Sequence, residues 1–440
     1  MVSVMKRYLL YTTACLLSLC GMLTSCDDEL SEKEQKNYYV FLQVQDNTKQ
    51  VLWNPSDYDF EKGNHYYMER YEKAAEALSG GCSSWRNGNF HGRNLDWFMA
   101  DYGCLIVQMP KGNGVRHASV GLINGSTSVT KAFLKGETLT AEQKATMPCA
   151  TVDGINDAGV ACNINIVPYA PGDKFVGKEG DLSAVCVVRF VLDNADNVDD
   201  AIAKLRTRKV RQDLVAVAGD ETHYMISDAR KTAVVEYVDG EMHVSYYQQT
   251  AGGCYSDKGN PAIMTNLYNY ALEAYGLGTP EFYDHHPYPM GLERWNTIKD
   301  QYASAANDVE SNLKIGQSVW YFKNFMADKV LWYSENAIAT CYGKTDTGWW
   351  YKAGGERHEA ADCPSAQKGF WDGFMPAYWQ SYEDSYGKMT DPHVEGNDFW
   401  ETSHTVVYNL QEKKGYLIPF ENFYAADRST LQPIEIALPR

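Results

Sequence analysis

Long apolar segments, clusters of basic residues and metal-type cysteine spacing are what this 440-residue chain has least of. After the first 22 residues, no stretch has the length and apolarity of a membrane-spanning helix. The formal net charge of −17, without a basic cluster, argues against nucleic acid as a partner, because binding phosphates needs a basic surface. The eleven cysteines include no C-x₂-C pair, and His285-His286 has no carboxylate or cysteine at ligand spacing, so we expect no metal site.

The composition and the first residues describe an exported globular protein. Hydrophobic residues make up 44% of the chain and charged residues 22%, as in a globular domain that can bury a large core. Residues 1–26 contain Lys6-Arg7, a short apolar stretch and Leu23-Thr24-Ser25-Cys26, the pattern of a bacterial lipoprotein signal peptide. An ordinary secretory signal that contains a cysteine is the alternative. Because all four positions of the lipoprotein pattern fit, we expect a lipid on Cys26 that anchors the protein in the bacterial cell envelope, at the outer membrane or the cell surface.

Cys82 is the candidate nucleophile of the chain. It follows Gly80-Gly81, which looks like a cleavable joint, and it precedes Arg93 and Asp96 in the same segment. Cleavage between Gly81 and Cys82 makes the cysteine a new N-terminus. Its own α-amine, with an ordinary pKa of about 7.7–8.0, can then take the thiol proton, so that one residue supplies both nucleophile and base.

The segment between the lipid site and the nucleophile, residues 27–81, is expected to be a tether and a pro-segment. Residues 27–37 are polar and acidic, which suits a flexible tether. Residues 38–42 are predicted to form a strand, and residues 66–78 a helix that ends at Ser79-Gly80-Gly81. Before cleavage the peptide bond ties up the α-amine, so the precursor should be inactive. Whether the pro-segment then leaves or stays bound is open at this point.

Four short motifs follow one another along the chain: Cys82 with Gly92-Arg93-Asn94-Leu95-Asp96, then Asp153-Gly154-Ile155-Asn156-Asp157-Ala158-Gly159-Val160, then Thr265-Asn266, then Glu293-Arg294-Trp295. Together they resemble the choloylglycine hydrolase and penicillin V acylase family of N-terminal-nucleophile (Ntn) amidases. The acid ceramidase group is a more distant relative. A single motif is weak, but the four in this order are specific, and they lie in the part of the chain from Cys82 to the C-terminus.

The resemblance implies a role for each matching residue. Cys82 matches the nucleophile that attacks the amide carbonyl and holds the acyl group as a thioester. Arg93 matches the arginine whose charge favours the thiolate, and Asp96 matches the aspartate that accepts a hydrogen bond from the α-amine. Asn266 matches an asparagine that donates to the oxyanion, and Arg294 a later arginine that organises the charges around the cysteine.

A second oxyanion asparagine is expected at the end of the strand after Gly159-Val160. A gapless comparison puts Ile166 there, with Asn165 one position earlier and Asn163 before that. A slip of one residue reverses the face to which a side chain points, so the difference matters. We choose Asn165, while Asn163 or a main-chain N–H remains an alternative.

The order of predicted elements suits an α+β fold, and the resemblance implies the four-layer αββα sandwich of Ntn hydrolases over residues 82–440. Predicted strands cover 104–109, 161–167, 214–217, 224–227, 233–238, 405–410 and 416–418, and predicted helices cover 181–194 and 198–206, the second with Asn197 as its N-cap. Residues 316–399 match the family worst and read as an aromatic-rich insertion. Its tryptophans either line an acyl-binding cleft or pack a subdomain, and Trp349-Trp350 beside Gly348 looks like a mobile loop edge.

Most remaining cysteines are interpreted as small buried hydrophobes, and Cys341 with Cys363 is the first candidate disulfide. His91, the histidine nearest to Cys82, is expected to have a structural or substrate-edge role rather than to act as a papain-type base.

The resemblance implies a cysteine amidase that hydrolyses non-peptide linear amides without metal or cofactor. Conjugated bile salts, phenoxyacyl penicillins and N-acyl amino acids or amines are the substrate classes within the family, so a small acyl-amide is the expected partner. A homo-oligomer is compatible with this interpretation. Two alternatives stay open: an acyltransferase that uses the same nucleophile, and an inactive surface lipoprotein that only binds an amphiphilic ligand.

Overall fold

The computed structural model describes two large sheets and the helices that cover them. It describes residues 48–69, 81–98, 103–125, 127–168, 180–211, 220–238, 241–277, 279, 281–282, 291–320, 322–323, 332–333, 342–345, 348–353, 356–362, 400–419 and 432–440. The predicted signal peptide, Cys26, the strands at 38–42 and 214–217, His285-His286, Cys341 and Cys363 lie outside these residues. No helix among the described residues is long and apolar enough to span a membrane.

The larger sheet has nine strands in the order β1-β4-β5-β6-β7-β10-β11-β12-β13. All neighbouring strands in it are antiparallel except β1 and β4, which run parallel. The strands are β1 (Lys49–Leu52), β4 (Cys104–Met109), β5 (Ser119–Asn124), β6 (Asp153–Asn156), β7 (Ala161–Pro168), β10 (Asp220–Ser227), β11 (Lys231–Val238), β12 (Glu241–Thr250) and β13 (Gly253–Tyr255).

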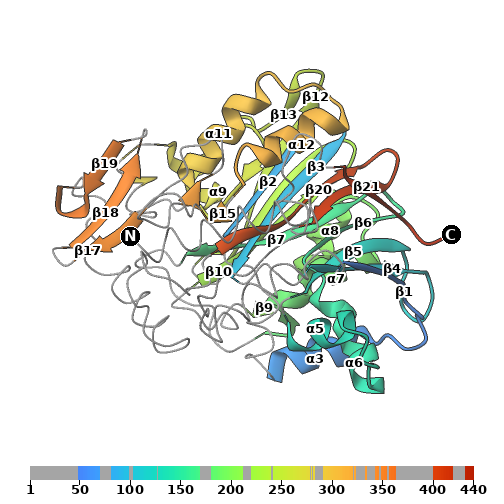
Figure 1. The fold of residues 1–440 in the computed structure, drawn as a ribbon. Coiled ribbons are helices and arrows are strands. Elements are labelled where there is room, and N and C mark those ends of the chain that lie inside the picture. The colour runs from blue at the N-terminus through green and yellow to red at the C-terminus, as the bar shows by residue number, and fades with distance from the viewer. Residues whose placement is uncertain are drawn as a thin grey trace, which may run out of the picture.

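The smaller of the two large sheets has six antiparallel strands in the order β14-β2-β3-β20-β21-β22. In Figure 1 the blue strands β2 and β3 lie beside the red strand β20, so segments far apart in the chain are neighbours here. The strands are β14 (Ile263–Met264), β2 (Gly81–Asn87), β3 (Phe90–Phe98), β20 (Trp400–Asn409), β21 (Lys414–Pro419) and β22 (Ile434–Ala437).

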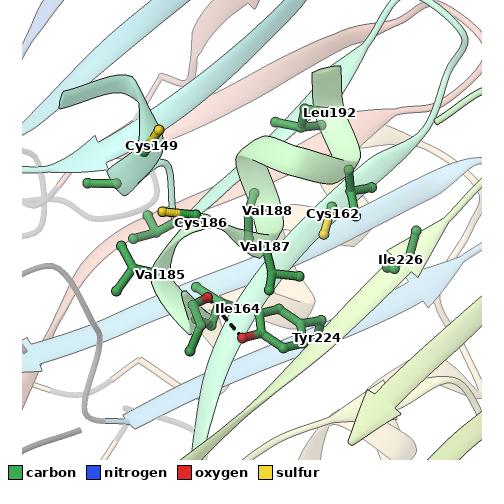
Figure 2. Packing of buried hydrophobic residues seen from close by; sticks show 14 of the residues in the cluster. Cys149, Cys162, Ile164, Val185, Cys186, Val187, Val188, Leu192, Tyr224 and Ile226 are labelled. Carbon is green, nitrogen blue, oxygen red and sulfur yellow. Dashed lines mark hydrogen bonds between the residues drawn. The ribbon is translucent and has the colours of Figure 1, made fainter. Parts of the chain in front are cut away.

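Helices cover the outer face of each sheet, and the inner faces pack on one another. An apolar cluster joins Ile106, Val120 and Ile155 of the larger sheet to Val406 and Leu417 of the smaller one. On the outer side of the larger sheet, helix α7 packs against Cys162, Ile164 and other β7 residues (Figure 2). Helices α11 and α12 contact β2, β3 and β20 of the smaller sheet. The four layers are therefore α, β, β and α, which confirms the predicted fold class.

The helices and short turns have the following bounds: α3 (Phe60–Glu69), α5 (Ser128–Leu134), α6 (Ala141–Thr146), α7 (Val187–Asn194), α8 (Val198–Leu205), α9 (Asn269–Tyr275), α11 (Leu292–Tyr302) and α12 (Val309–Gln317), with 3₁₀ turns η2 (Met147–Ala150), η3 (Ala184–Cys186) and η4 (Ala360–Asp362). Two predicted helix starts were wrong. Helix α3 begins at Phe60 rather than at residue 66, because the Asp59 carboxylate accepts from the Lys62 N–H as an N-terminal cap. Residues 181–194 are helical only from η3 onward, because β8 (Leu182–Ser183) pairs with β9 (Val210–Arg211).

Other predicted elements were placed well. Strands β4 and β7 fall on the predicted ranges, and α8 begins after Asn197, whose side chain accepts from the Asp200 N–H. Besides the end of α12 and the turn η4, the described part of the aromatic-rich region forms two small sheets: β15 (Phe322–Lys323) with β16 (Trp332–Tyr333), and β17 (Tyr342–Thr345) with β18 (Gly348–Ala353) and β19 (Glu356–Glu359). Trp349-Trp350 is therefore strand rather than loop edge. Trp320 is buried and donates to Thr405 Oγ1 at 2.7 Å, which supports packing for this tryptophan.

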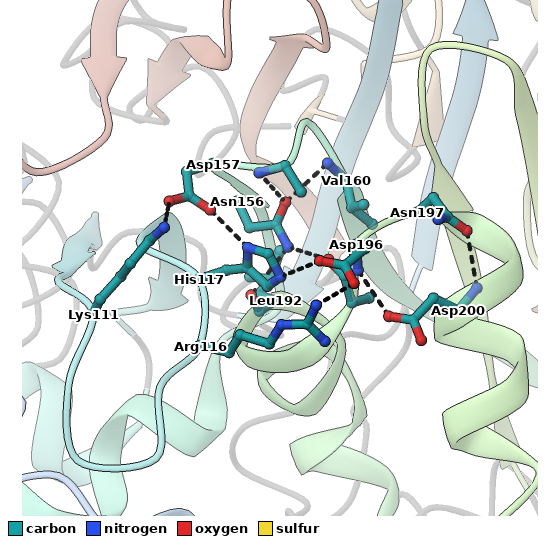
Figure 3. Close-up of polar contacts among 12 residues, drawn as sticks. Lys111, Arg116, His117, Asn156, Asp157, Val160, Leu192, Asp196, Asn197 and Asp200 are labelled. Carbon is teal, nitrogen blue, oxygen red and sulfur yellow. Dashed lines mark hydrogen bonds and ion pairs between the residues drawn. The ribbon is translucent and has the colours of Figure 1, made fainter.

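The motif that begins at Asp153 consists of strand β6 and the turn that follows it. Asn156 accepts from the Ala158 and Val160 N–H groups and donates to the Leu192 and Ala195 carbonyls, so it ties the turn to the end of α7 (Figure 3). Gly159 has φ +83°, and a Cβ there would lie 2.7 Å from the Leu410 carbonyl oxygen. A polar cluster of Lys111, His117, Asp157 and Asp196 lies beside it. These residues support the fold, which leaves Asp153 as the member of the motif that faces the site.

Candidate functional site

The β2–β3 hairpin sets the positions of the nucleophile and its neighbours. Cys82 pairs with Leu95, Ser84 with Arg93, and Gly81 with Asp96. Because side chains alternate along a strand, Cys82 and Arg93 point between the two sheets, whereas Asp96 points to the helix-covered side. The Cys82 side chain is fully buried. The hairpin therefore places the thiol and the two predicted charges around one strand end.

Arg93 lies against the thiol and is held by a carboxylate. Its Nη2 is 3.6 Å from Cys82 Sγ and donates to the Ile164 carbonyl at 2.7 Å, while its Nη1 forms a 2.6 Å ion pair with Asp153. Asp153 also accepts from Tyr408 at 2.5 Å and lies 2.9 Å from His404 Nε2. Burial alone would raise the pKa of Asp153, but His404, Arg93 and these hydrogen bonds lower it to about 2. This part of the site is a fully buried and well-paired charge network.

Arg294 and Asn266 surround the main chain of the nucleophile. From α11, Arg294 donates to the Cys82 carbonyl and to the Asn266 side-chain oxygen, and its Nη1 donates to Ser83 Oγ at 2.8 Å. Asn266 Oδ1 also accepts from the Cys82 N–H at 3.1 Å. The Asn266 amide donates to the Ile166 carbonyl. The structure thus brings Cys82, Asn266 and Arg294 into direct contact, as the motifs predict.

Asp96 lies beside the bond that precedes the nucleophile. It pairs with Gly81, accepts from Thr402 Oγ1 at 2.6 Å, and has its Oδ2 3.7 Å from Arg294. That buried oxygen has no hydrogen-bond partner. Burial raises the pKa of Asp96 to about 6, although Arg294, Thr402 and Arg93 oppose the shift. The uncleaved chain therefore holds an unused acceptor next to Gly81-Cys82.

A bulge in β20 lets one strand support both carboxylates. The register of β20 against β3 shifts between Thr402 and His404, with Thr402 opposite Asp96 and His404 opposite Leu95. Without the extra residue, Thr402 and His404 would point to the same face of the sheet. With it, Thr402 reaches Asp96 on the helix side and His404 reaches Asp153 between the sheets.

Asn165 is close to the site but does not contact the thiol through its described bonds. Its amide donates to the Met264 carbonyl at 3.3 Å, and its oxygen accepts from Asn163 at 2.9 Å and from Ser84 at 3.4 Å. Asn163 in turn bonds His91, which also contacts Ser227. Burial lowers the pKa of His91 to about 3. The pair of asparagines thus belongs to a polar network that joins the two sheets, and His91 has the structural surroundings predicted for it.

The loop that carries Asn266 is fixed by a residue that the sequence did not single out. The buried Glu236 carboxylate, from β11, accepts from the Asn269 N–H at 2.8 Å and the Tyr270 N–H at 2.5 Å, the first residues of α9. His223 Nδ1 lies 3.0 Å from the same carboxylate. Glu236 therefore caps the helix that follows Asn266 and sets the position of its side chain.

Several supporting residues were missed for a common reason. Asp153 could have been predicted, because it is a carboxylate at the start of one of the four motifs. Thr402, His404, Tyr408 and Glu236 reach the site only through sheet pairing and stand in no local pattern.

Among the described residues no group of three His, Cys, Asp or Glu could hold a metal ion. None of the six described cysteines forms a disulfide, and all are buried, as predicted for most of them.

Comparison with known proteins places this site in a family. The family model for linear amide C-N hydrolases, choloylglycine hydrolase family, matches residues 83–288, so the match begins directly after Cys82. This segment is therefore similar to the choloylglycine hydrolase family. The matched segment contains Arg93, Asp96, Asn165 and Asn266, while Arg294 and the β20 residues lie beyond it.

Individual relatives of the choloylglycine hydrolase segment are distant. Penicillin V acylase of Pectobacterium atrosepticum is 31% identical over 109 residues, which is 22% of this chain and 29% of that protein. Penicillin V acylase of Agrobacterium tumefaciens has a TM-score of 0.33 at 14% identity, over 78% of this chain and 83% of that one. A mutant of conjugated bile acid hydrolase of Clostridium perfringens has a TM-score of 0.36 at 12% identity, over 81% and 92%.

Proposed function

We propose that this protein is an amidase that hydrolyses non-peptide linear amides with Cys82 as an N-terminal nucleophile, after cleavage of the Gly81-Cys82 bond. The observation that carries the proposal is the convergence of Arg93, Asn266 and Arg294 on the thiol, main-chain nitrogen and carbonyl of one buried cysteine. A cysteine used only for packing has no need of two arginines and an asparagine on its thiol, carbonyl and main-chain nitrogen. The family match of the segment that begins at residue 83 supports the same chemistry.

Cleavage converts the Cys82 nitrogen from an amide into a base. In the uncleaved chain this nitrogen has one hydrogen, which it donates to Asn266 Oδ1. The freed amine gains further hydrogens, and the unused Asp96 oxygen beside Gly81 is the acceptor for one of them. The amine is then oriented with its lone pair available for the thiol proton.

Each turnover then needs two attacks at one carbonyl carbon. The thiolate attacks R–CO–NH–R′, the α-ammonium returns its proton to the amide nitrogen, and the C–N bond breaks to release the amine R′–NH₂. The α-amine next deprotonates water, which attacks the thioester. The thiolate leaves and the acid R–COOH is released. Arg93 stabilises the thiolate in both halves of the cycle.

Two donors are available for the oxyanion of each tetrahedral intermediate. One is the Asn266 amide, whose second hydrogen is not used by its bond to the Ile166 carbonyl. The other is the main-chain N–H of Ile166. The Ile164 N–H donates to the Val152 carbonyl, and the Ile166 carbonyl accepts from Asn266. The main-chain groups of residues 164 and 166 therefore lie on the side of β7 that faces away from β10. Strand β6 pairs with that side only as far as Asn163. We favour this N–H over the Asn165 side chain, because the Asn165 amide is held by the Met264 carbonyl and its oxygen by Asn163 and Ser84, and none of these bonds reaches Cys82.

The substrate is a small acyl-amide: a conjugated bile acid or penicillin V, as the relatives' names indicate, or an N-acyl amino acid or amine of the same linear-amide class. The protein acts in the cell envelope, held by the lipid that we propose on Cys26. An acyltransferase would use the same thioester, with an amine in place of water in the second half of the cycle.

The deciding experiment combines N-terminal sequencing and intact mass with an assay on the three substrate classes. Wild-type protein should yield a chain that begins at Cys82, together with released acid and amine. Cys82→Ala should remain uncleaved, fold normally and show no turnover, whereas Cys254→Ala, a control at another buried cysteine, should be cleaved and active. Turnover by Cys82→Ala would refute the proposal. Acyl transfer to added amine, with little free acid, would favour the acyltransferase.

A further inference from the structure

Residues 48–69 precede the nucleophile in the chain but form part of the larger sheet. Strand β1 pairs in parallel with β4, from Lys49 opposite Leu105 to Leu52 opposite Gln108. The pairing continues one residue further, since the Trp53 N–H donates to the Gln108 carbonyl at 2.8 Å. β1 thereby covers an edge of β4 that would otherwise present unpaired main-chain groups.

Buried side chains fix this segment more firmly than the strand alone. Tyr58 is 1% exposed and donates to Asp193 at 2.8 Å, while its carbonyl accepts from Asn113 at 2.8 Å. Trp53 is 5% exposed and donates to the Lys144 carbonyl at 3.1 Å. Both rings belong to the main apolar cluster of the protein. Removal of the segment would open that cluster and leave the buried Asp193 without its tyrosine partner.

Helix α3 adds hydrogen bonds to the part of the chain that follows Cys82. The buried Asn64 donates to the Asp181 carbonyl at 2.7 Å and accepts from the Ser183 N–H at 2.7 Å, and both partners lie after the nucleophile in the chain. Gly63 lies so close to Cys149 that a Cβ would come within 2.3 Å of its sulfur. These contacts require the segment and the rest of the chain to fit as parts of one core.

The scissile bond lies elsewhere. Gly81-Cys82 is in β2 of the smaller sheet, whereas β1 is the edge strand of the larger one (Figure 1). None of the contacts described for residues 48–69 involves Gly81. Cleavage there cuts the chain without breaking the contacts that hold the segment.

We propose that residues 48–69 remain bound after cleavage as a small subunit, and that they hold the catalytic chain 82–440 at the membrane without a covalent link. This inference rests on the proposed function, since it assumes cleavage at Gly81-Cys82 and a lipid on Cys26. Because Cys26 precedes the cut, the lipid and the nucleophile end on different pieces. The β1, Tyr58 and Asn64 contacts are then the connection between them, so the partner of this surface is the chain's own N-terminal piece.

The first test uses full-length protein with a C-terminal affinity tag. After cleavage, capture through the tag followed by denaturing gels and intact mass should show both pieces in equal amounts, and catalytic chain alone would overturn the proposal. If the chain is never cut, the proposed function fails at its first step, but retention is still testable. A protease site placed within residues 72–78 then separates the pieces in the Cys82→Ala protein.

The second test weakens the contacts in the cut protein. Tyr58→Ala and Val51→Pro should lower the fraction of N-terminal piece retained through washing at least tenfold, because they remove the buried ring and an N–H on the edge that pairs with β4. Leu52→Ala, at a side chain 63% exposed, should leave retention unchanged. If neither variant folds, dilution of the cut wild-type protein measures the same dissociation. Equal retention in all variants would overturn the proposal.

The third test follows the lipidated protein in membrane fractions. The cut catalytic chain should sediment with membranes in the wild type and with Leu52→Ala, and should become soluble with Tyr58→Ala while the N-terminal piece stays behind. A wild-type catalytic chain that is soluble after cleavage would overturn the tethering role. Cys26→Ser should release both pieces together.

Discussion

The two arginines near Cys82 differ in their partner carboxylates: that of Arg93 has more hydrogen bonds than that of Arg294. Arg93 meets Asp153 at 2.6 Å, and Asp153 has further bonds to His404 and Tyr408. Arg294 is 3.7 Å from Asp96, one oxygen of which is buried without a hydrogen bond. Both carboxylates are buried, yet the pKa of Asp153 is lowered to about 2 and that of Asp96 is raised to about 6.

The difference fits the proposed roles of the two halves of the site, Arg93 with Asp153 and Arg294 with Asp96. In the proposed reaction the Arg93 half keeps one fixed charge beside the thiol, which suits an Asp153 carboxylate held by Arg93, His404 and Tyr408. The Arg294 half surrounds the peptide bond whose cleavage we propose, and its Asp96 has a free acceptor oxygen for the amine that cleavage would produce. The predictions below test this division.

The largest effect is expected from removing Arg93. Arg93→Met leaves the Asp153 charge buried with neutral partners, which should destabilise the protein by about 3–5 kcal/mol and abolish turnover. Urea unfolding in the Cys82→Ala background measures the first effect without cleavage. Adding Asp153→Asn should recover a large part of the lost stability. A double variant no more stable than Arg93→Met would show that the pair is not the source of the effect.

Asn266→Ala should lower kcat about 10²–10³-fold, because one oxyanion donor is lost. Asn165→Ala should lower kcat less than about tenfold, since the Asn165 side chain is held by Met264, Asn163 and Ser84, away from Cys82. Steady-state kinetics on cleaved enzyme, with cleavage checked by mass, compare the two. If Asn165→Ala costs as much as Asn266→Ala, the Asn165 side chain rather than the Ile166 N–H completes the oxyanion site.

The pH dependence of stability should separate the two carboxylates. For Asp96 the folded pKa of about 6 lies above the ordinary value of 3.8, so the uncleaved Cys82→Ala protein should gain stability as the pH falls from about 6 to about 4. The upper bound of this gain is about 3 kcal/mol. For Asp153 the sign is reversed, and stability should be lost as the pH falls from about 4 to about 2. Adding Asp96→Asn should remove the first change only, as urea unfolding across this range would reveal.

The smallest effect is expected at the Asn266 loop. Glu236→Gln keeps a side-chain acceptor for the α9 N–H groups but removes the charge, so kcat should fall several-fold with little change in KM. Glu236→Ala should fall further, because both N–H groups lose their acceptor. An unchanged kcat in both variants would show that the cap does not position Asn266.

The sequence predicted the residues at the centre of this comparison better than their partners. Cys82, Arg93 and Asp96 lie in one hairpin, and Asn266 and Arg294 lie in short motifs, so local patterns were enough. Thr402 and His404 reach the site through a bulge in a strand that begins at Trp400, and no local pattern predicts where a bulge falls. The prediction of Asn165 depends on the register of one strand, and the structure shows its amide donating to the Met264 carbonyl.

The fold was predicted in outline for similar reasons. Strands rich in β-branched residues and the Asn197 cap were found because they depend on neighbouring residues. The start of α3 was missed although Asp59 is an ordinary cap, because the helical spacing was read only from Tyr66 onward. The place of residues 48–69 in the larger sheet could not be foreseen, since β1 pairs with a strand on the other side of the nucleophile.

The pairing of β1 with β4 also imposes an order of events during biogenesis. While Gly81-Cys82 is intact, the two strands are held in one molecule, so their pairing does not depend on the protein concentration. If the bond broke in an unfolded chain, the strands would have to find each other as separate molecules. If the proposed cleavage takes place, we therefore expect folding to come before it, because the β2–β3 hairpin that positions Cys82 and the β1–β4 pairing both belong to the folded chain.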